Sequence, residues 1–550
     1  MVHDYTTRHA CLTDESPGRR LLTHRRATAM LVAAAMVLGI YHIAWTTGST
    51  MVAGDTTRYV AIARGLYDEP GNTLRTNVLP PGYPALILIA QGLLRPLLSG
   101  LTHPLDWAVS AQIVSLAGFC ATIWLVARLG SALAGERAGL LGTAAVVFLP
   151  YPVAYGVDGL SDFPALAMVA GASLLTVRAI QRDRARLLPW VGLLAAAGYY
   201  IRPEALVLGL FPALVVAGLR AVRTASAGLR RRWVLGSAVA ALLAGAIILP
   251  YLVYMGSVIP KKQPPHRPDV LAYRDMPTKT EPVVEASVVS TVRGIGESVI
   301  EVADRLLNVM EFYFAVFLVV GMVVWLRRRH TEGLRSWLVV LLTTSALMLV
   351  WHNFRFGYTS KRHLLPLAVT PAGVVGLGIE STARSIHAAL IRHRSRAAGF
   401  GTKRWAIVLV VAGLAARTPS TLKPLHIDRT CQRSTAEKLT KLVEPGQRVA
   451  IWDGRIAFYA RLDETVTMNT RVWPRTLYNW IREERVHWMV ARYDSEDADD
   501  PVLRMIAATG SEAFEAVHRC TQDRRIDVVF RLRPDKLGPQ PPAKPLSAAD

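Results

Sequence analysis

A lone carboxylate stands at the start of a polar stretch that follows the first long apolar run of the chain. Asp55 opens this stretch, an amphipathic pattern that includes Tyr59 follows, and a Pro-Pro-Gly-Tyr corner with Tyr83 ends it. A carboxylate beside a membrane-spanning segment is a candidate for function, and it can serve as a general base. The alternative is structural, because Asp is also a favoured residue at a helix N-terminus.

A second acidic candidate lies in another short polar segment. Asp162 stands in a Ser-Asp-Phe-Pro sequence, and Asp158 is its rival four residues earlier. The alternative is again a helix start, since Asp followed by Pro is a common N-terminal signal. The two acids Asp55 and Asp162 could share a divalent cation, but no acidic cluster requires a metal, and we predict no metal ligands.

Basic side chains that could hold a phosphate lie at the ends of apolar runs, because arginine offers two-point contacts and lysine a point charge. These candidates are Arg58, Arg202, Lys261, Lys361 and Arg362. All of them except Arg58 have a structural alternative. Arg202 could simply pair with Glu204, Lys261 could begin a solvated loop, and the last two could snorkel at the membrane interface. Tyr59 and Tyr83 could line a sugar pocket or belong to an interfacial aromatic belt.

The composition shows what must position these residues. The chain has 550 residues, 51% of them hydrophobic, and a mean hydropathy of +0.28, which is too apolar for a soluble enzyme of this size. Its net charge is +22, but residues 418–550 hold 21 basic and 19 acidic residues. The basic excess therefore lies in short loops between apolar runs, which favours the positive-inside rule and argues against nucleic-acid binding.

About eleven membrane spans are predicted. They are 28–46, 107–127, 138–155, 163–178, 187–201, 204–220, 233–255, 309–326, 336–352, 364–381 and 405–417. The apolar run 85–98 is short and broken by Arg95-Pro96, so we expect it to lie at the interface. Counting it as a span would turn every later basic loop outward, against the positive-inside rule.

This topology divides the chain into parts. The predicted parts are a disordered cytoplasmic tail, 1–27, a transmembrane domain, 28–417, with a first outer loop, 47–106, a periplasmic domain, 418–533, and a disordered tail, 534–550. The arginines before the first span stay inside, so the first outer loop and the C-terminal domain face outward. We predict a multi-pass protein of the bacterial inner membrane.

Residues 418–533 show strands alternating with helical patterns. Buried strands are predicted at 448–452, 486–491 and 526–530, with a helix near 431–443, which indicates a small doubly wound α/β sheet. Cys431 and Cys520 both fall in this outward domain, where a disulfide between them could form; the alternative is that both are free and buried.

The order of these features resembles the GT-C membrane glycosyltransferases. The shared series is an outward Asp, a Pro-Pro-Gly-Tyr corner, a second acidic site, an Arg-Pro-Glu turn, and Arg-His-Leu-Leu-Pro before a late span. The resemblance is to the bacterial branch near the protein mannosyltransferases and lipid A aminoarabinose transferases, and it covers nearly the whole chain. It implies that Asp55 is catalytic. His363 stands where the family usually has Tyr, and we assign it with Tyr59 and Tyr83 to the sugar or acceptor pocket.

The resemblance implies a polyprenyl-phosphate sugar as donor and an envelope glycan, lipid or protein as acceptor. Phosphate is a good leaving group, so one carboxylate that takes the acceptor proton suffices, with cations to hold the phosphate. The expected function is therefore sugar transfer at the periplasmic face with Asp55 as base. Two alternatives remain: a transporter or flippase of lipid-linked sugars, and a non-catalytic relative that only binds envelope glycans.

Overall fold

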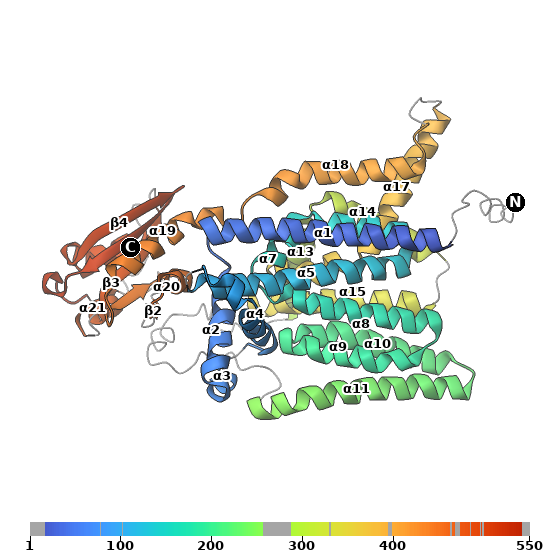
Figure 1. The fold of residues 1–550 in the computed structure, drawn as a ribbon, viewed down its shortest axis with the longest axis horizontal. Coiled ribbons are helices and arrows are strands. Elements are labelled where there is room, and N and C mark those ends of the chain that lie inside the picture. Colours follow the sequence, from blue (N-terminus) through green and yellow to red (C-terminus); the bar gives the residue numbers. More distant parts are fainter. Residues whose placement is uncertain are drawn as a thin grey trace.

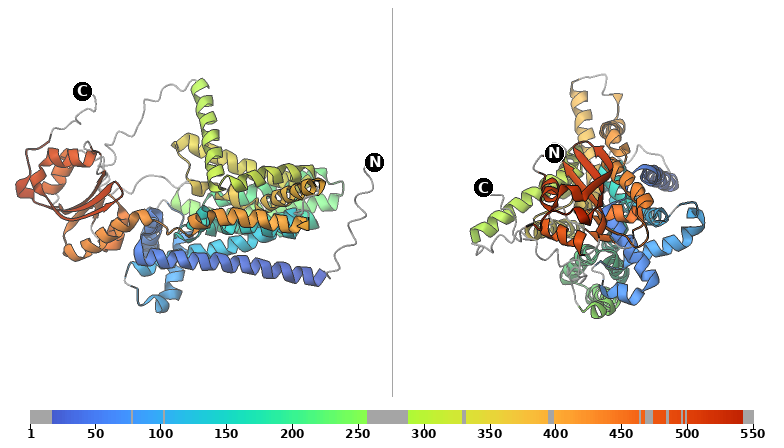
Figure 2. Two further views of the ribbon diagram at one scale, coloured as in Figure 1. Left: turned by 90° about the horizontal axis from the view of Figure 1, so that it is seen from above. Right: turned by 90° about the vertical axis from the view of Figure 1, so that its left-hand side faces the viewer.

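The protein has two parts, a bundle of long helices and a smaller sheet-containing domain beyond one end of that bundle (Figures 1 and 2). The computed structural model describes residues 17–76, 79–101, 103–256, 288–328, 332–393, 399–462, 465–467, 474–483, 486–494, 497 and 500–541. We call the end of the bundle that meets the sheet the domain end. This arrangement confirms the predicted class, a polytopic helical membrane protein with a C-terminal α/β domain.

Apolar helices, most of them long, build the bundle. They are α1 (Pro17–Ser49), α5 (Leu105–Ala134), α6 (Glu136–Val147), α7 (Pro150–Val157), α8 (Asp162–Arg182), α9 (Leu188–Ile201), α10 (Glu204–Arg223), α11 (Ala227–Met255), α13 (Val288–Val309), α14 (Tyr313–Arg327), α15 (Glu332–Phe356), α16 (Leu365–Val369), α17 (Ala372–Arg392) and α18 (Thr402–Leu422). Among the described residues, seven helices suit a membrane span, or up to ten if each of three bent pairs counts as one. The predicted eleven also included α9, which is shorter than these spans.

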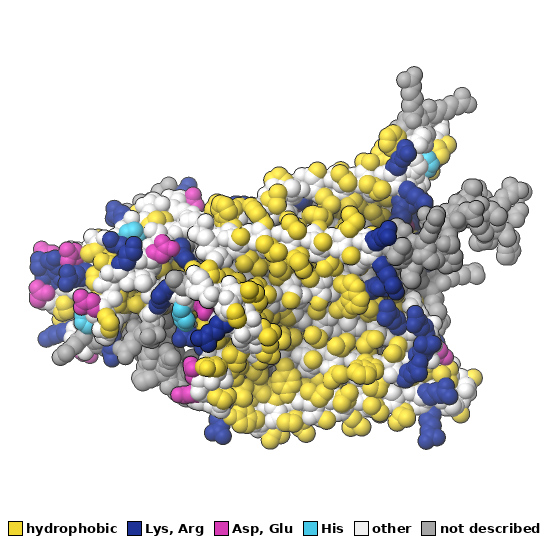
Figure 3. Space-filling model, viewed as in Figure 1, with side chains coloured by type: hydrophobic (Ala, Val, Ile, Leu, Met, Phe, Trp, Pro, Cys, Tyr) yellow, Lys and Arg dark blue, Asp and Glu magenta, His cyan; other side chains and the backbone are white. Residues whose placement is uncertain are grey.

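Small residues bring the bundle helices close together. A methyl group added to Gly376 in α17 would lie 1.8 Å from the carbonyl oxygen of Ala138 in α6, and one added to Gly142 would lie 1.7 Å from that of Ala372. Such glycines let helix backbones touch where lipid supplies no hydrophobic driving force. The face of the bundle seen in Figure 3 is a broad apolar band, with basic side chains gathered at the end far from the C-terminal domain.

Shorter helices of the segment 47–106 lie at the domain end. They are α2 (Gly54–Asp68), α3 (Pro70–Thr76) and α4 (Gly82–Leu98). α2 runs across the bundle axis (Figure 1) and buries Tyr59, Val60, Ile62 and Ala63, as its amphipathic pattern predicts. α4 contains the run 85–98 and, at 17 residues, is shorter than the candidate spans.

The C-terminal domain holds a five-stranded sheet in the order β2-β1-β3-β5-β4. Its strands are β1 (Arg448–Ile451), β2 (Thr465–Thr467), β3 (Val486–Asp494), β4 (Phe514–Gln522) and β5 (Arg525–Leu532), and its helices are α19 (Thr430–Leu442), α20 (Gly454–Ala460), α21 (Pro474–Arg482) and α22 (Pro501–Thr509). β2, β1 and β3 are parallel, whereas β3, β5 and β4 are antiparallel. The sheet is thus mixed rather than doubly wound, because β4 and β5 form a hairpin through a short polar turn. Cys431 in α19 and Cys520 in β4 form a disulfide.

Two predicted tails are more ordered than expected. α1 begins at Pro17, and the His24 imidazole lies 2.7 Å from the Ser131 hydroxyl, so residues 17–27 belong to this helix instead of a disordered tail, whereas residues 1–16 lie outside the described part of the chain. Residues 534–541 are also described, and Leu537 packs on the core of the C-terminal domain. In both segments, the contacts that His24 and Leu537 make with the folded parts offset the conformational entropy lost when the segment is ordered.

Candidate functional site

Asp55 forms an ion pair with Arg362 across the domain end of the bundle. Asp55 lies in the first turn of α2, and Arg362 lies in the short helix η3 (Lys361–Leu364) before α16. One Arg362 guanidinium nitrogen donates to Asp55 Oδ2. The Asp55 side chain does not cap α2, because the N-cap residue is Ala53 and Asp55 is already the second residue of the helix. The structural alternative for Asp55 therefore finds no support in the geometry.

Arg58 lies one turn after Asp55 and belongs to the rim of the site. Its Nη1 atom is 4.0 Å from Asp55 Oδ1, which is beyond hydrogen-bond distance, and its side chain is 76% exposed. An exposed cation at this distance adds little to stability, yet it remains within reach of an incoming anion.

Asp162 forms the second ion pair, with Arg202. Asp162 is the first residue of α8 and is 4% exposed, and Arg202 follows α9 and is 20% exposed. The Arg202 guanidinium also lies 3.4 Å from Glu204, so the predicted Arg202–Glu204 pair is secondary to the contact with Asp162. Asp162 Oδ2 is buried and has no hydrogen-bond partner within the described residues. Its second oxygen is therefore ready for a donor from a ligand.

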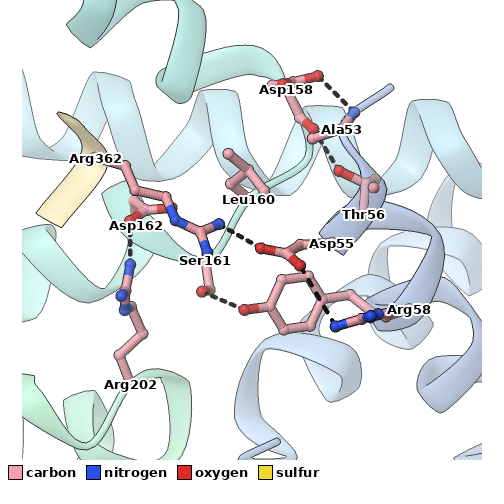
Figure 4. A network of polar contacts seen from close by, with 12 residues as sticks. Ala53, Asp55, Thr56, Arg58, Asp158, Leu160, Ser161, Asp162, Arg202 and Arg362 are labelled. Carbon is pink, nitrogen blue, oxygen red and sulfur yellow. Dashed lines mark hydrogen bonds and ion pairs between the residues drawn. The ribbon is translucent and has the colours of Figure 1, made fainter. Parts of the chain in front are cut away.

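Arg362 lies between the two carboxylates (Figure 4). It is paired with Asp55 and is also close enough to Asp162 to interact with its charge. Four elements supply this arrangement: α2, α8, the turn after α9, and η3. The site thus alternates two acids with two arginines, and an anionic ligand could take either arginine from its carboxylate.

An apolar cavity begins at these charges. It has a volume of about 270 Å³ and lies among α8, α10, α15, η3 and α16. Asp162, Arg202, Glu204, Arg362 and His363 supply its polar part, and the remaining wall is mostly apolar. We call it the bundle cavity. A site with a charged mouth and apolar walls fits a ligand that has a polar head and a hydrocarbon body.

The bundle cavity reaches the lipid-facing surface of α15. Trp351 and Phe356 line the cavity, and they are 64% and 47% exposed on the outside of the bundle. Since such large apolar side chains are exposed on a candidate span, the wall here faces lipid. The sequence could not locate this cavity, because its walls come from five separate elements.

Lys361 and His363 flank Arg362 in η3. The Lys361 ammonium donates to the Tyr151 hydroxyl and lies 4.2 Å from the centroid of the Tyr151 ring. The His363 ring lines the bundle cavity, 4.9 Å from the His352 ring, and its Nδ1 atom is buried without a hydrogen-bond partner in the described part of the chain. His363 therefore lines the bundle cavity, whereas Lys361 is held by Tyr151 beside it, and the predicted roles of both residues stay predictions.

The two tyrosines support α2 instead of opening into the cavity. The Tyr59 hydroxyl is 2.9 Å from the Ser161 hydroxyl, its ring packs edge-on against Tyr83, and burial raises the pKa of the Tyr59 hydroxyl. Tyr83 has no exposed surface, and its hydroxyl donates to the carbonyl oxygen of Ala111. This burial corrects the prediction that Tyr83 lines a sugar pocket, and Tyr59 is almost as deeply buried.

Asp158 holds the start of α2 in place. Its Oδ1 atom accepts from the Ala53 amide at 2.9 Å, its carbonyl accepts from the Thr56 hydroxyl at 2.6 Å, and its Oδ2 atom is 2.7 Å from His426 Nε2. The sequence offered Asp158 only as a rival to Asp162. The sequence did not indicate a role for His426, because it lies 268 positions from its partner Asp158.

Two predictions concern a phosphate ligand and a metal ion. Lys261 lies outside the described residues, so its predicted role in phosphate binding stays a prediction. In the part of the chain that the structure describes, no group of three or more His, Cys, Asp or Glu side chains could hold a metal ion.

Comparisons with known proteins agree with this fold. A family model described as dolichyl-phosphate-mannose-protein mannosyltransferase matches residues 99–254. A comparison with curated proteins gave no match. Apo ArnT from Cupriavidus metallidurans matches with a TM-score of 0.55 at 14% identity, over 96% of this chain and all of that chain.

Two further solved structures contain a lipid phosphate. ArnT from Cupriavidus metallidurans bound to undecaprenyl phosphate matches with a TM-score of 0.53 at 14% identity, over 91% of this chain and 97% of that chain. The oligosaccharyltransferase AglB from Archaeoglobus fulgidus, in complex with an inhibitory peptide and a dolichol-phosphate, matches with a TM-score of 0.54 at 12% identity, over 89% and 73%. These structures show that the chain has the fold of ArnT and AglB, and the family model over residues 99–254 agrees with the resemblance seen in the sequence.

Proposed function

We propose that this protein transfers a sugar from a polyprenyl-phosphate carrier to an envelope acceptor at the periplasmic face of the inner membrane. The single observation that carries the proposal is the Asp55–Arg362 pair at the mouth of the bundle cavity. A base and a phosphate-binding cation stand together there, beside an apolar space that reaches lipid. The solved structures with undecaprenyl phosphate and dolichol-phosphate support a lipid phosphate as the ligand class.

The donor phosphate binds the cations at the cavity mouth. Arg362 and Arg202 each have a carboxylate partner in the structure, and Lys361 stands next to Arg362. Phosphate oxygens accept two parallel hydrogen bonds from a guanidinium, as a carboxylate does. Donor binding therefore draws Arg362 away from Asp55, and the first polyprenyl units pack against the apolar wall of the bundle cavity.

Asp55 then acts as the base. An acceptor hydroxyl or amine attacks the anomeric carbon, its proton moves to Asp55, and the bond from that carbon to the phosphate oxygen breaks. The electron pair of this bond leaves with the polyprenyl phosphate, whose growing charge is balanced by Arg362 and its basic neighbours. In the resting structure Arg362 occupies Oδ2 of Asp55, so the base becomes fully available only when the donor has arrived.

The orientation follows from the charge distribution. Basic side chains gather at the end of the bundle far from the C-terminal domain (Figure 3), and the positive-inside rule places that end in the cytoplasm. The site and the C-terminal domain then lie outside, together with the disulfide between Cys431 and Cys520, which suits an oxidising compartment.

The test is transfer from a radiolabelled polyprenyl-phosphate sugar by the purified protein in nanodiscs. Asp55→Asn is expected to lower the transfer rate by about 10²–10⁴-fold, because it removes the base. Glu69→Gln is the matched control, since Glu69 is an exposed acid of the same outer loop. Unchanged transfer by Asp55→Asn would exclude Asp55 as the base. Movement of the labelled lipid across the bilayer without transfer would show a transporter instead.

A further inference from the structure

A second cavity lies where the C-terminal domain meets the start of α5. It has a volume of about 320 Å³ and lies between the segment 103–105 and the helices α19 and α20. We call it the junction cavity. Its charged side chains are Arg433, Lys441, Arg461 and Glu437. Three cations therefore face one carboxylate, an excess of positive charge in a water-accessible hollow.

Arg433 is fixed in this cavity. Its guanidinium lies 4.5 Å from the centroid of the Tyr459 ring, and its Nε atom is 2.9 Å from Glu437 Oε1. The Arg433 side chain is 13% exposed, whereas Glu437 is 62% exposed. Arg433 Nη1 is buried without a hydrogen-bond partner in the described part of the chain. An unsatisfied donor on a charged group is costly, and an anionic oxygen would satisfy it.

The other two cations flank Arg433. Lys441 lies exposed in the last turn of α19, and Arg461 follows the end of α20. Arg461 has a φ of 58°, in the left-handed region that glycine adopts at lower cost. An arginine at this position keeps its charge beside the cavity despite the backbone strain.

The junction cavity is tied to the chain segment that carries Asp55. The Tyr459 hydroxyl, on the ring that Arg433 covers, accepts a hydrogen bond from the Val52 amide at 3.1 Å. Val52 is three residues before Asp55, so their Cα atoms are at most about 11 Å apart. The chain segment that leads to Asp55 is therefore anchored beside the junction cavity, and an acceptor held there by its phosphate must extend from the cavity to Asp55 to react.

We propose that the junction cavity binds a phosphate group carried by the acceptor. This inference rests on the proposed function and adds to it the chemical class of the acceptor. The donor phosphate has its own cations at the bundle cavity, so the junction cations are left for a second anion. A phosphate held there by Arg433, Lys441 and Arg461 would direct the acceptor hydroxyl towards Asp55, and an acceptor without phosphate would lack this contact.

The first experiment measures binding of inorganic phosphate by calorimetry to the full-length protein in detergent. It is done in the Arg362→Gln background, which weakens the donor phosphate site. Changing Arg433 and Lys441 together to Gln is expected to weaken the remaining phosphate binding at least about tenfold. Lys438→Gln is the matched control, because this lysine lies on α19 but does not line the cavity. Equal affinity in the double variant and the control would overturn the proposal.

The second experiment separates an acceptor phosphate from a lipid headgroup. If phosphatidic acid in nanodiscs abolishes the binding of inorganic phosphate, the cavity holds a membrane lipid, and the assignment to an acceptor is wrong. If phosphate still binds, the assignment stands.

The transfer assay then tests the link with the proposed function. The Arg433/Lys441 double variant is expected to raise the KM for a phosphorylated sugar acceptor about tenfold without changing the KM for the donor. An unchanged acceptor KM would overturn the role in acceptor binding. Phosphate binding at the junction without any transfer would refute the proposed function but not the anion site.

Discussion

The buried pair between Asp162 and Arg202 can be tested by a double-mutant cycle. Asp162 is 4% exposed and Arg202 is 20% exposed. Arg202→Gln leaves the buried Asp162 carboxylate without its direct partner and with only Arg362 as a nearby cation, which is expected to lower the free energy of unfolding by about 3 kcal/mol. Asp162→Asn should cost less, since Arg202 keeps Glu204 at 3.4 Å and is partly solvated. The double variant has neither charge, so we expect a coupling energy of about 2 kcal/mol.

The assay is reversible unfolding by SDS in mixed micelles, followed by tryptophan fluorescence. Arg58→Gln is the control, because Arg58 is 76% exposed and 4.0 Å from its carboxylate, and we expect a change within about 0.5 kcal/mol. Additive effects of Arg202→Gln and Asp162→Asn, with a coupling energy below about 0.5 kcal/mol, would refute the reasoning. They would show that this ion pair does not form in the folded protein.

Two further predictions concern the scaffold. Gly376→Ala is expected to lower the free energy of unfolding by about 2 kcal/mol, because the new methyl group would press on the α6 backbone. Gly245→Ala is the control, since this glycine of α11 has open space around it and the change should not alter stability. Thermal melts that are alike for both variants would contradict the close packing. Cys520→Ser is expected to cost about 2–5 kcal/mol of stability in the C-terminal domain, since the disulfide to Cys431 closes a long loop over a separation of 89 residues. Protease resistance of that domain measures the loss, and labelling of both thiols in native membranes without reductant would refute the bond.

The sequence predicted those features that local patterns encode. Apolar runs and basic loops gave the membrane class, and the polar stretch at Asp55 gave the first member of the site. The partners of the acids could not be predicted, because Asp55 and Arg362 are 307 positions apart and no local pattern links them. For Arg202 the sequence suggested its near neighbour Glu204, yet the main contact is with Asp162, 40 positions away.

The role of the tyrosines was misjudged for a related reason. Tyr83 stands in a Pro-Pro-Gly-Tyr corner and was a candidate for a sugar pocket or an interfacial aromatic belt, but the helices α2, α4 and α5 close around it and leave it no exposed surface. The junction cavity escaped prediction because its cations come from the ends of two helices whose relative placement depends on the folded domain. Sequence patterns describe single elements, whereas these features belong to the space between elements.

The exposed wall of the bundle cavity at Trp351 and Phe356 has a kinetic consequence. A hydrophobic ligand that arrives there diffuses in two dimensions within one leaflet and never crosses water. Occupancy of the cavity then depends on the mole fraction of that ligand among the surrounding lipids. Diluting the protein in buffer leaves this mole fraction unchanged, whereas diluting the membrane with inert phospholipid lowers the mole fraction in proportion.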